Sequence, residues 1–174
     1  RSLMRARLVL AAVLALAACT AAHAATITVV NNDGAGEGFN DTTAVSAVGG
    51  NSGTTLGAQR LNAFTYAASI WAAELTSSVT IKVDATMDSL TCDATGAVLG
   101  SAGARTVHFN FTNAPYSNTY YPQALANKIA GSDLTGTNDI LAQFNSAIGT
   151  TCAFPSVWYY GLDGLGGASK IDFV

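Results

Sequence analysis

The clearest periodic pattern in the chain is that of an amphipathic helix beginning near Leu56. Apolar residues recur at steps of three and four, which brings them onto one stripe of a helix. The stripe consists of Leu61, Phe64, Ala68, Trp71 and Leu75. The polar residues that fall largely off it are Gln59, Arg60, Asn62, Thr65 and Glu74. We therefore expect a long helix that packs on a sheet, with Leu61, Phe64 and Trp71 in the core.

The clearest strand follows this helix directly. Apolar and polar residues alternate from Val79 to Asp88, a pattern that buries one face of a strand and leaves the other in solvent. The core residues expected here are Val79, Ile81 and Val83. A second alternation, at Val107, Phe109 and Phe111, predicts another strand. The Gly-, Ala- and Ser-rich stretch between the two is interpreted as a connection.

Weaker patterns give the remaining elements. Residues 25–31 and 157–160 have the composition of short strands, and Pro122 suits the first turn of a helix that Gly131 ends. Residues 139–148 fit either a helix or an edge strand. The final apolar run, residues 170–174, lacks a closing Gly, Pro or cap, and we expect it to continue in a longer reading frame. The order predicts an α+β domain, incomplete as given, with a long helix packed on a mixed or antiparallel sheet.

The first 24 residues have the organisation of an export signal. Three arginines precede an apolar run over residues 8–18, and residues 22–24 offer a small-x-small cleavage site. Residues 25–174 would then form a single domain that is secreted or periplasmic. The alternative is a lipoprotein signal ending before Cys19, whose lipidation would anchor the protein at the bacterial envelope.

Cleavage after residue 24 makes the chain strongly acidic. It removes three of the eight basic residues and none of the eleven acidic ones, so the mature chain has a net charge of −6. This balance argues against nucleic acid and anionic lipid as partners. No apolar run after the signal is long enough for a transmembrane segment.

Two cysteines, Cys92 and Cys152, follow the signal. In an oxidising compartment such a pair most simply forms a disulfide, which would close a long loop and stabilise the domain by about 3–5 kcal/mol. A metal site is the weaker interpretation, because the pair lacks CxxC spacing and histidine is nearly absent.

Candidate catalytic groups are few. His108 is the one histidine after the signal, and it falls on the solvent face of a predicted strand. The GxSxG motif is absent, and Asp84 and Asp88 are interpreted as solvated surface residues. We therefore assign no catalytic and no metal-binding residue to this chain. The loop from Asp33 to Asp41 is interpreted as a solvated turn, with calcium binding left open.

The order of elements resembles the N-terminal part of a zincin metallopeptidase. Several segments further resemble a group of secreted bacterial metallopeptidases that often carry a protease-associated insert. These segments are Gly38–Asp41, Gly57–Asn62, Ala67–Trp71, Leu99–Gly103, Tyr159–Asp163 and Ile171–Val174. The resemblance extends over most of the mature chain, and none of these segments is a catalytic motif.

The resemblance implies an exported zinc-dependent endopeptidase acting on protein or peptide substrates. In that group the run that begins like Ile171–Val174 continues into HExxH, which supplies zinc ligands and the Glu general base. This sequence ends before the motif, so no catalytic residue is carried over, and zinc is implied for the full-length protein alone. The resemblance implies a scaffold role here: a sheet whose edge strand holds substrate by strand addition, and the helix behind it.

Two other functions remain open on the sequence. One is a non-enzymatic exported binding or surface domain. The other is a carbohydrate-binding module that uses a cluster of aromatic residues to line a groove, although such residues more often pack a core. The cluster consists of Tyr116, Tyr120, Tyr121, Trp158, Tyr159 and Tyr160.

Overall fold

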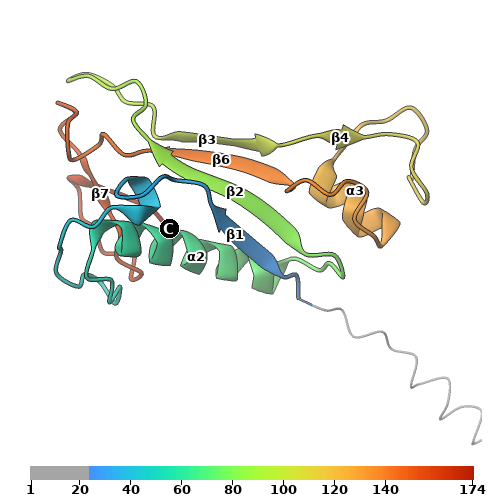
Figure 1. The fold of residues 1–174 in the computed structure, drawn as a ribbon, viewed down its shortest axis with the longest axis horizontal. Coiled ribbons are helices and arrows are strands. Elements are labelled where there is room, and N and C mark those ends of the chain that lie inside the picture. The colour runs from blue at the N-terminus through green and yellow to red at the C-terminus, as the bar shows by residue number, and fades with distance from the viewer. Residues whose placement is uncertain (1–23) are drawn as a thin grey trace, which may run out of the picture.

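A four-stranded mixed sheet forms the centre of the computed structural model, which describes residues 24–174 (Figure 1). Three strands run parallel, namely β1 (Ile27–Asn31), β2 (Ile81–Asp88) and β6 (Ile140–Asn145). The fourth, β3 (Gly100–Ala104), pairs antiparallel with β6 and gives the order β1-β2-β6-β3. With its helices and mixed sheet, the protein has the α+β fold that the sequence predicts.

The long helix α2 (Leu56–Glu74) connects β1 to β2. Parallel neighbours need such a crossover, because a tight turn can join only antiparallel strands. The helix begins at Thr55, whose Oγ1 accepts a hydrogen bond of 3.2 Å from the backbone N–H of Ala58. It lies along one face of the sheet (Figure 1), and Ala63 at its centre is completely buried.

Shorter elements surround the sheet. A one-turn 3-10 helix, η1 (Gly38–Asn40), packs against α2, and a small hairpin joins β4 (Val107–His108) to β5 (Tyr121–Pro122). Helix α3 (Gln123–Ala130) follows and ends at Gly131, which adopts a left-handed φ of 73°. A parallel pair, β7 (Val157–Tyr159) and β8 (Lys170–Asp172), forms the C-terminal part of the chain.

The core lies between α2, η1 and the ends of β2 and β8. Its buried members are Phe39, Ala63, Ala85, Met87, Tyr160 and Phe173. Phe173 lies at the centre of the aromatic packing. Its ring centroid is 4.9–6.4 Å from those of Phe64, Phe144, Trp158 and Tyr160.

The buried face of α2 is rotated relative to the apolar stripe that the sequence predicts. Arg60 and Gln59, expected off the stripe, are 2% and 4% exposed. Arg60 is buried because it donates to the carbonyl of Gly38 (2.9 Å) and to the hydroxyl of Tyr160 (3.2 Å), and it pairs with Asp41. Burial raises the pKa of Tyr160 to about 12, against the opposing effect of Arg60.

The assignment of Trp71 to the core is wrong, because its side chain is 62% exposed. Leu61 and Phe64 are half-buried, since the first half of α2 is covered by the sheet and η1. Trp71 faces the same side as Phe64, but the second half of the helix borders an apolar groove that the described residues leave open.

The strands differ from the prediction in three places. β2 begins at Ile81, so half-buried Val79 precedes it, whereas Val83 is buried as expected. The strand expected over residues 107–111 is limited to the two residues of β4, and the supposed connection before it contains β3. β6, considered as an edge strand, lies inside the sheet.

The signal peptide and the lipidation site Cys19 fall on residues 1–23, outside the described part of the chain. Across residues 24–174, the helices are too short or too polar to span a bilayer.

Candidate functional site

Among residues 24–174, no strand pairs with the outer edge of β3, which leaves a row of backbone groups without a strand partner. The carbonyl of Leu99 accepts from the N–H of Asn145 (2.9 Å), and the N–H of Arg105 donates to the carbonyl of Asp139 (2.8 Å). In an antiparallel pair only alternate residues bond to the partner strand. The odd-numbered residues of this segment therefore bond to β6. Gly100, Ala102 and Ala104 direct both their N–H and C=O groups away from β6, toward the outer edge.

Nothing in the side chains of β3 protects this edge. Its sequence is Gly-Ser-Ala-Gly-Ala, without charge or proline, and residues 101–104 are exposed. Natural sheets normally blunt an exposed edge with Lys, Pro, a bulge or a covering element, because free backbone groups recruit other strands. An unprotected edge of small residues leaves room for an added strand to approach.

A buried asparagine fixes the entry to β3. Asn145, at the end of β6, is fully buried, and its Nδ2 donates to the carbonyls of Val98 (2.8 Å) and Leu90 (3.3 Å). Its Oδ1 accepts from the N–H groups of Leu90 (3.1 Å) and Ala147 (2.9 Å). These bonds tie the approach to β3 to its partner strand, so that the edge is held rigidly.

A disulfide reinforces the same end of the sheet. Cys92 and Cys152 are bonded, with their Cα atoms 5.8 Å apart. Cys92 lies in the connection between β2 and β3, and Cys152 lies after β6. The bond thus joins the segments that enter and leave the β6–β3 pair.

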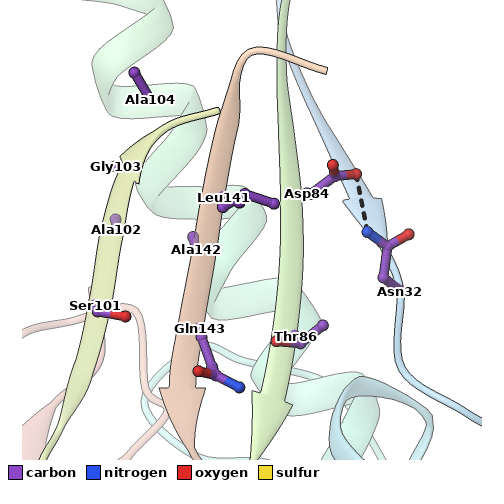
Figure 2. A pocket seen from close by; sticks show the side chains of 10 residues that line it. All are labelled: Asn32, Asp84, Thr86, Ser101, Ala102, Gly103, Ala104, Leu141, Ala142 and Gln143. Atoms are coloured by element: carbon purple, nitrogen blue, oxygen red, sulfur yellow. Dashed lines mark hydrogen bonds between the residues drawn. The ribbon is translucent and has the colours of Figure 1, made fainter. Parts of the chain in front are cut away.

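The sheet face turned away from α2 holds a shallow pocket of about 430 Å³ beside β3, lined by both polar and apolar residues (Figure 2). Asp84, only 5% exposed, accepts hydrogen bonds there from Asn32 (2.9 Å), Asn138 and Arg105. Burial raises the pKa of Asp84, but these three partners and the charge of Arg105 outweigh it and hold the pKa below its ordinary value. Asp84 is therefore an ion-paired carboxylate and unsuited to act as a general base near neutral pH.

The opposite face carries an apolar groove of about 420 Å³ between α2 and the sheet. Phe64, Ala68 and Trp71 form its helix wall, and Ile140 and Phe144 contribute from β6. The C-terminal end of the described chain lies beside α2 (Figure 1), where Phe173 contacts both Phe64 and Phe144. Phe173 therefore packs against two of the residues that line this groove.

The residues described here do not fit a zinc site. Within 24–174, no three His, Cys, Asp or Glu side chains come together in a way that could hold a metal ion. The Nε2 atom of His108 lies 3.3 Å from the hydroxyl of Thr135, and both cysteines are in the disulfide.

The loop from Asp33 to Asp41 uses its carboxylates within the fold. Asp33 accepts from the backbone N–H groups of Phe39 (2.6 Å) and Met87 (3.0 Å), while Asp41 pairs with Arg60. The loop thus connects η1, β2 and α2, which accounts for Asp33 and Asp41 by packing.

The aromatic residues considered for carbohydrate binding do not share one surface. Tyr121, Tyr159 and Tyr160 are buried, and Trp158 is half-buried with its Nε1 donating to the carbonyl of Asn145 (2.8 Å). Tyr116 and Tyr120 are exposed on the hairpin between β4 and β5.

Sequence reasoning missed β3, the strand that carries the free edge. Its one signal was a run of small residues between two strand patterns, and small residues have low strand propensity.

Comparison of the chain with known proteins gives no matching family model, no matching curated protein and no matching solved structure.

Proposed function

We propose that residues 25–174 are the substrate-holding, N-terminal segment of an exported zinc-dependent endopeptidase, and that an extended peptide binds by adding a strand to β3. The observation that carries the proposal is the unprotected outer edge of β3. Main-chain hydrogen bonds give affinity in this mode of recognition without requiring a particular sequence.

The dimensions of β3 suit a short peptide. At about 3.3 Å per residue, its five residues span roughly 17 Å, the length of about five residues of an extended ligand. Gly100, Ala102 and Ala104 each offer one donor and one acceptor. A peptidase benefits from such binding because it holds the substrate backbone extended beside the reacting groups.

The zinc ligands and the Glu general base would lie in a segment after Val174, as the resemblance implies. No step of zinc chemistry is assigned to the described residues, which do not fit the metal. The apolar groove supports this arrangement: its size and its lining by Phe64, Trp71 and Ile140 suit one face of an amphipathic helix. The contacts of Phe173 with Phe64 and Phe144, two residues that line the groove, support delivery of that helix by the chain itself.

The disulfide between Cys92 and Cys152 is compatible with an exported protein, since such bonds persist in oxidising compartments. Secretion to the periplasm or the medium remains part of the proposal.

Peptide binding by the exported chain tests the role of β3. Ala102→Pro removes an outward N–H and places a ring on the edge, while Pro is tolerated on an edge strand. We expect it to weaken binding of a fluorescein-labelled mixed nonapeptide library at least tenfold, with the melting temperature little changed. Ser101→Ala, on the same strand but with its backbone bonded to β6, is the matched control and should bind normally. Equal binding by both variants would exclude β3 as the site.

The zinc part of the proposal is tested on the protein recovered from its native host. Intact mass, zinc content and chelator-sensitive proteolysis are measured together. A longer product that carries HExxH, binds one zinc and loses proteolysis on chelation supports the endopeptidase. A zinc-free product with a β3-dependent peptide affinity but no proteolysis would instead identify a non-enzymatic binding domain.

A further inference from the structure

The hairpin from Val107 to Pro122, called here the aromatic hairpin, displays large apolar side chains to solvent. Tyr116, Tyr120 and Phe109 are 72%, 66% and 52% exposed, and Val107 is 50% exposed. Such a group is unusual outside a binding surface, because isolated apolar residues are common on proteins but contiguous ones are not.

Three of the exposed residues, Val107, Phe109 and Tyr120, lie on one face of the hairpin. Val107 is opposite Pro122 and His108 opposite Tyr121, so continuing the register places Phe109 opposite Tyr120. Their ring centroids are indeed 5.2 Å apart. The other face carries buried Tyr121, which packs edge-on against Phe111 at 5.3 Å. One face of the hairpin is thus packed, and the other is an apolar surface.

The hairpin tip is rigid. Asn110 Oδ1 accepts from the N–H of Asn118 (2.7 Å), and Asn110 Nδ2 donates to Asn118 Oδ1 (3.1 Å). The hydroxyl of Tyr121 accepts from the N–H of Tyr116 (3.1 Å). Asn110, Asn113 and Asn118 all adopt positive φ, a left-handed conformation that Asn tolerates better than most residues. The aromatic pair is therefore held in place before any ligand binds.

The aromatic hairpin follows β3 directly along the chain. Only Arg105 and Thr106 separate β3 from β4, and the carbonyl of Thr106 accepts from the N–H of Gln123, the residue after the hairpin (3.1 Å). The aromatic hairpin therefore begins next to the end of the β3 edge. Asp, Glu, Lys and Arg are absent from Thr106 to Pro122, and His108 pairs with Tyr121 on the other face, so this surface matches an uncharged, apolar ligand group.

We propose that the aromatic hairpin is a specificity subsite for the peptide held on β3, and that it selects an aromatic or large aliphatic side chain. This inference rests on the proposed function of β3. Val107 lies five residues beyond Ala102, about 17 Å along an extended chain. The selected side chain therefore lies four to six residues from the peptide residue opposite Ala102, and peptides shorter than about five residues cannot reach both.

The test uses the exported chain and fluorescein-labelled nonapeptides of Ala, Ser and Thr, with one Phe moved through the nine positions. Fluorescence anisotropy gives the affinity for each peptide. We expect one window of positions to bind about tenfold more tightly than the all-small peptide, a gain typical of one aromatic contact. The double variant Phe109→Ser, Tyr120→Ser should abolish this gain and leave the affinity for the all-small peptide unchanged.

Controls separate the possible outcomes. Tyr116→Ser is the matched exposed-aromatic variant and should retain most of the gain, and near-ultraviolet circular dichroism checks that each variant folds. If Ala102→Pro abolishes binding but the double variant retains the positional gain, the subsite is refuted and the role of β3 stands. If Ala102→Pro binds every peptide normally, the proposed function of the edge fails first. Binding of a neutral polysaccharide or of phosphatidylcholine vesicles that the double variant loses, without any positional gain for peptides, also overturns the inference.

Discussion

At the residue scale, Asp84 is the clearest case of a buried side chain whose charge is stabilised by partners from distant parts of the sequence. It lies on the solvent-facing register of β2, yet it is buried because Asn32, Asn138 and Arg105 come to it from three other segments. The alternation along β2 predicts which face Asp84 occupies. It does not predict burial, because the partners are 21 to 54 residues away in sequence.

We expect Asp84→Asn to destabilise the protein at pH 7 by about 1–3 kcal/mol, since it leaves Arg105 without its carboxylate. The folded-state pKa of Asp84 lies below its ordinary value, so its contribution is present above about pH 3.9 and is lost as the pH falls through the lowered pKa. The difference between variant and parent should therefore shrink at pH 2–3. Urea unfolding at both pH values measures it.

Asp88→Asn is the control for this effect. Asp88 lies on the same face of β2 and accepts one hydrogen bond, from Gln143 Nε2 (2.8 Å). Its replacement should cost less than about 1 kcal/mol. A loss as large as that of Asp84→Asn would show that the ion pair with Arg105 adds little.

At the element scale, the sequence predicts α2 and β2 well and β3 not at all. A helix of 19 residues and a strand of eight have strong periodicities that tertiary contacts reinforce. β3 forms because it pairs with β6, which lies about 40 residues further along the chain. The local sequence Gly-Ser-Ala-Gly-Ala does not predict that pairing. The proposed function thus depends on β3, the strand that the local sequence pattern predicts least well.

The helix α2 allows a direct test of which half is packed. We expect Trp71→Ala to change the free energy of unfolding by about 1 kcal/mol or less, because the ring is 62% exposed. Phe64→Ala, which removes a ring in contact with Phe39, Phe144 and Phe173, should cost about 2–4 kcal/mol. Thermal unfolding of the two variants compares them, and similar losses would mean that the second half of α2 is covered.

At the scale of the whole molecule, the disulfide encloses the segment that contains the proposed peptide-binding edge. The 60-residue separation between Cys92 and Cys152 takes in β3, the aromatic hairpin, α3 and β6. We expect the double variant Cys92→Ser, Cys152→Ser to lose about 3–5 kcal/mol of stability, as expected for a loop of this length. Guanidinium unfolding with and without reductant provides the measurement. Reductant should destabilise the parent to the level of the variant and leave the variant unaffected, and an insensitive parent would contradict the prediction.

The interior position of β6 has a consequence for the time course of folding. When the chain is synthesised or exported from its N-terminus, β1, α2 and β2 can assemble early. β3, however, has no partner strand until residues 140–145, which form β6, are also available. Pairings between distant segments are slow to form, and strands awaiting a partner are prone to mispair. Under the proposed export of the chain, this delay keeps the sheet from closing before residues 140–145 have been delivered.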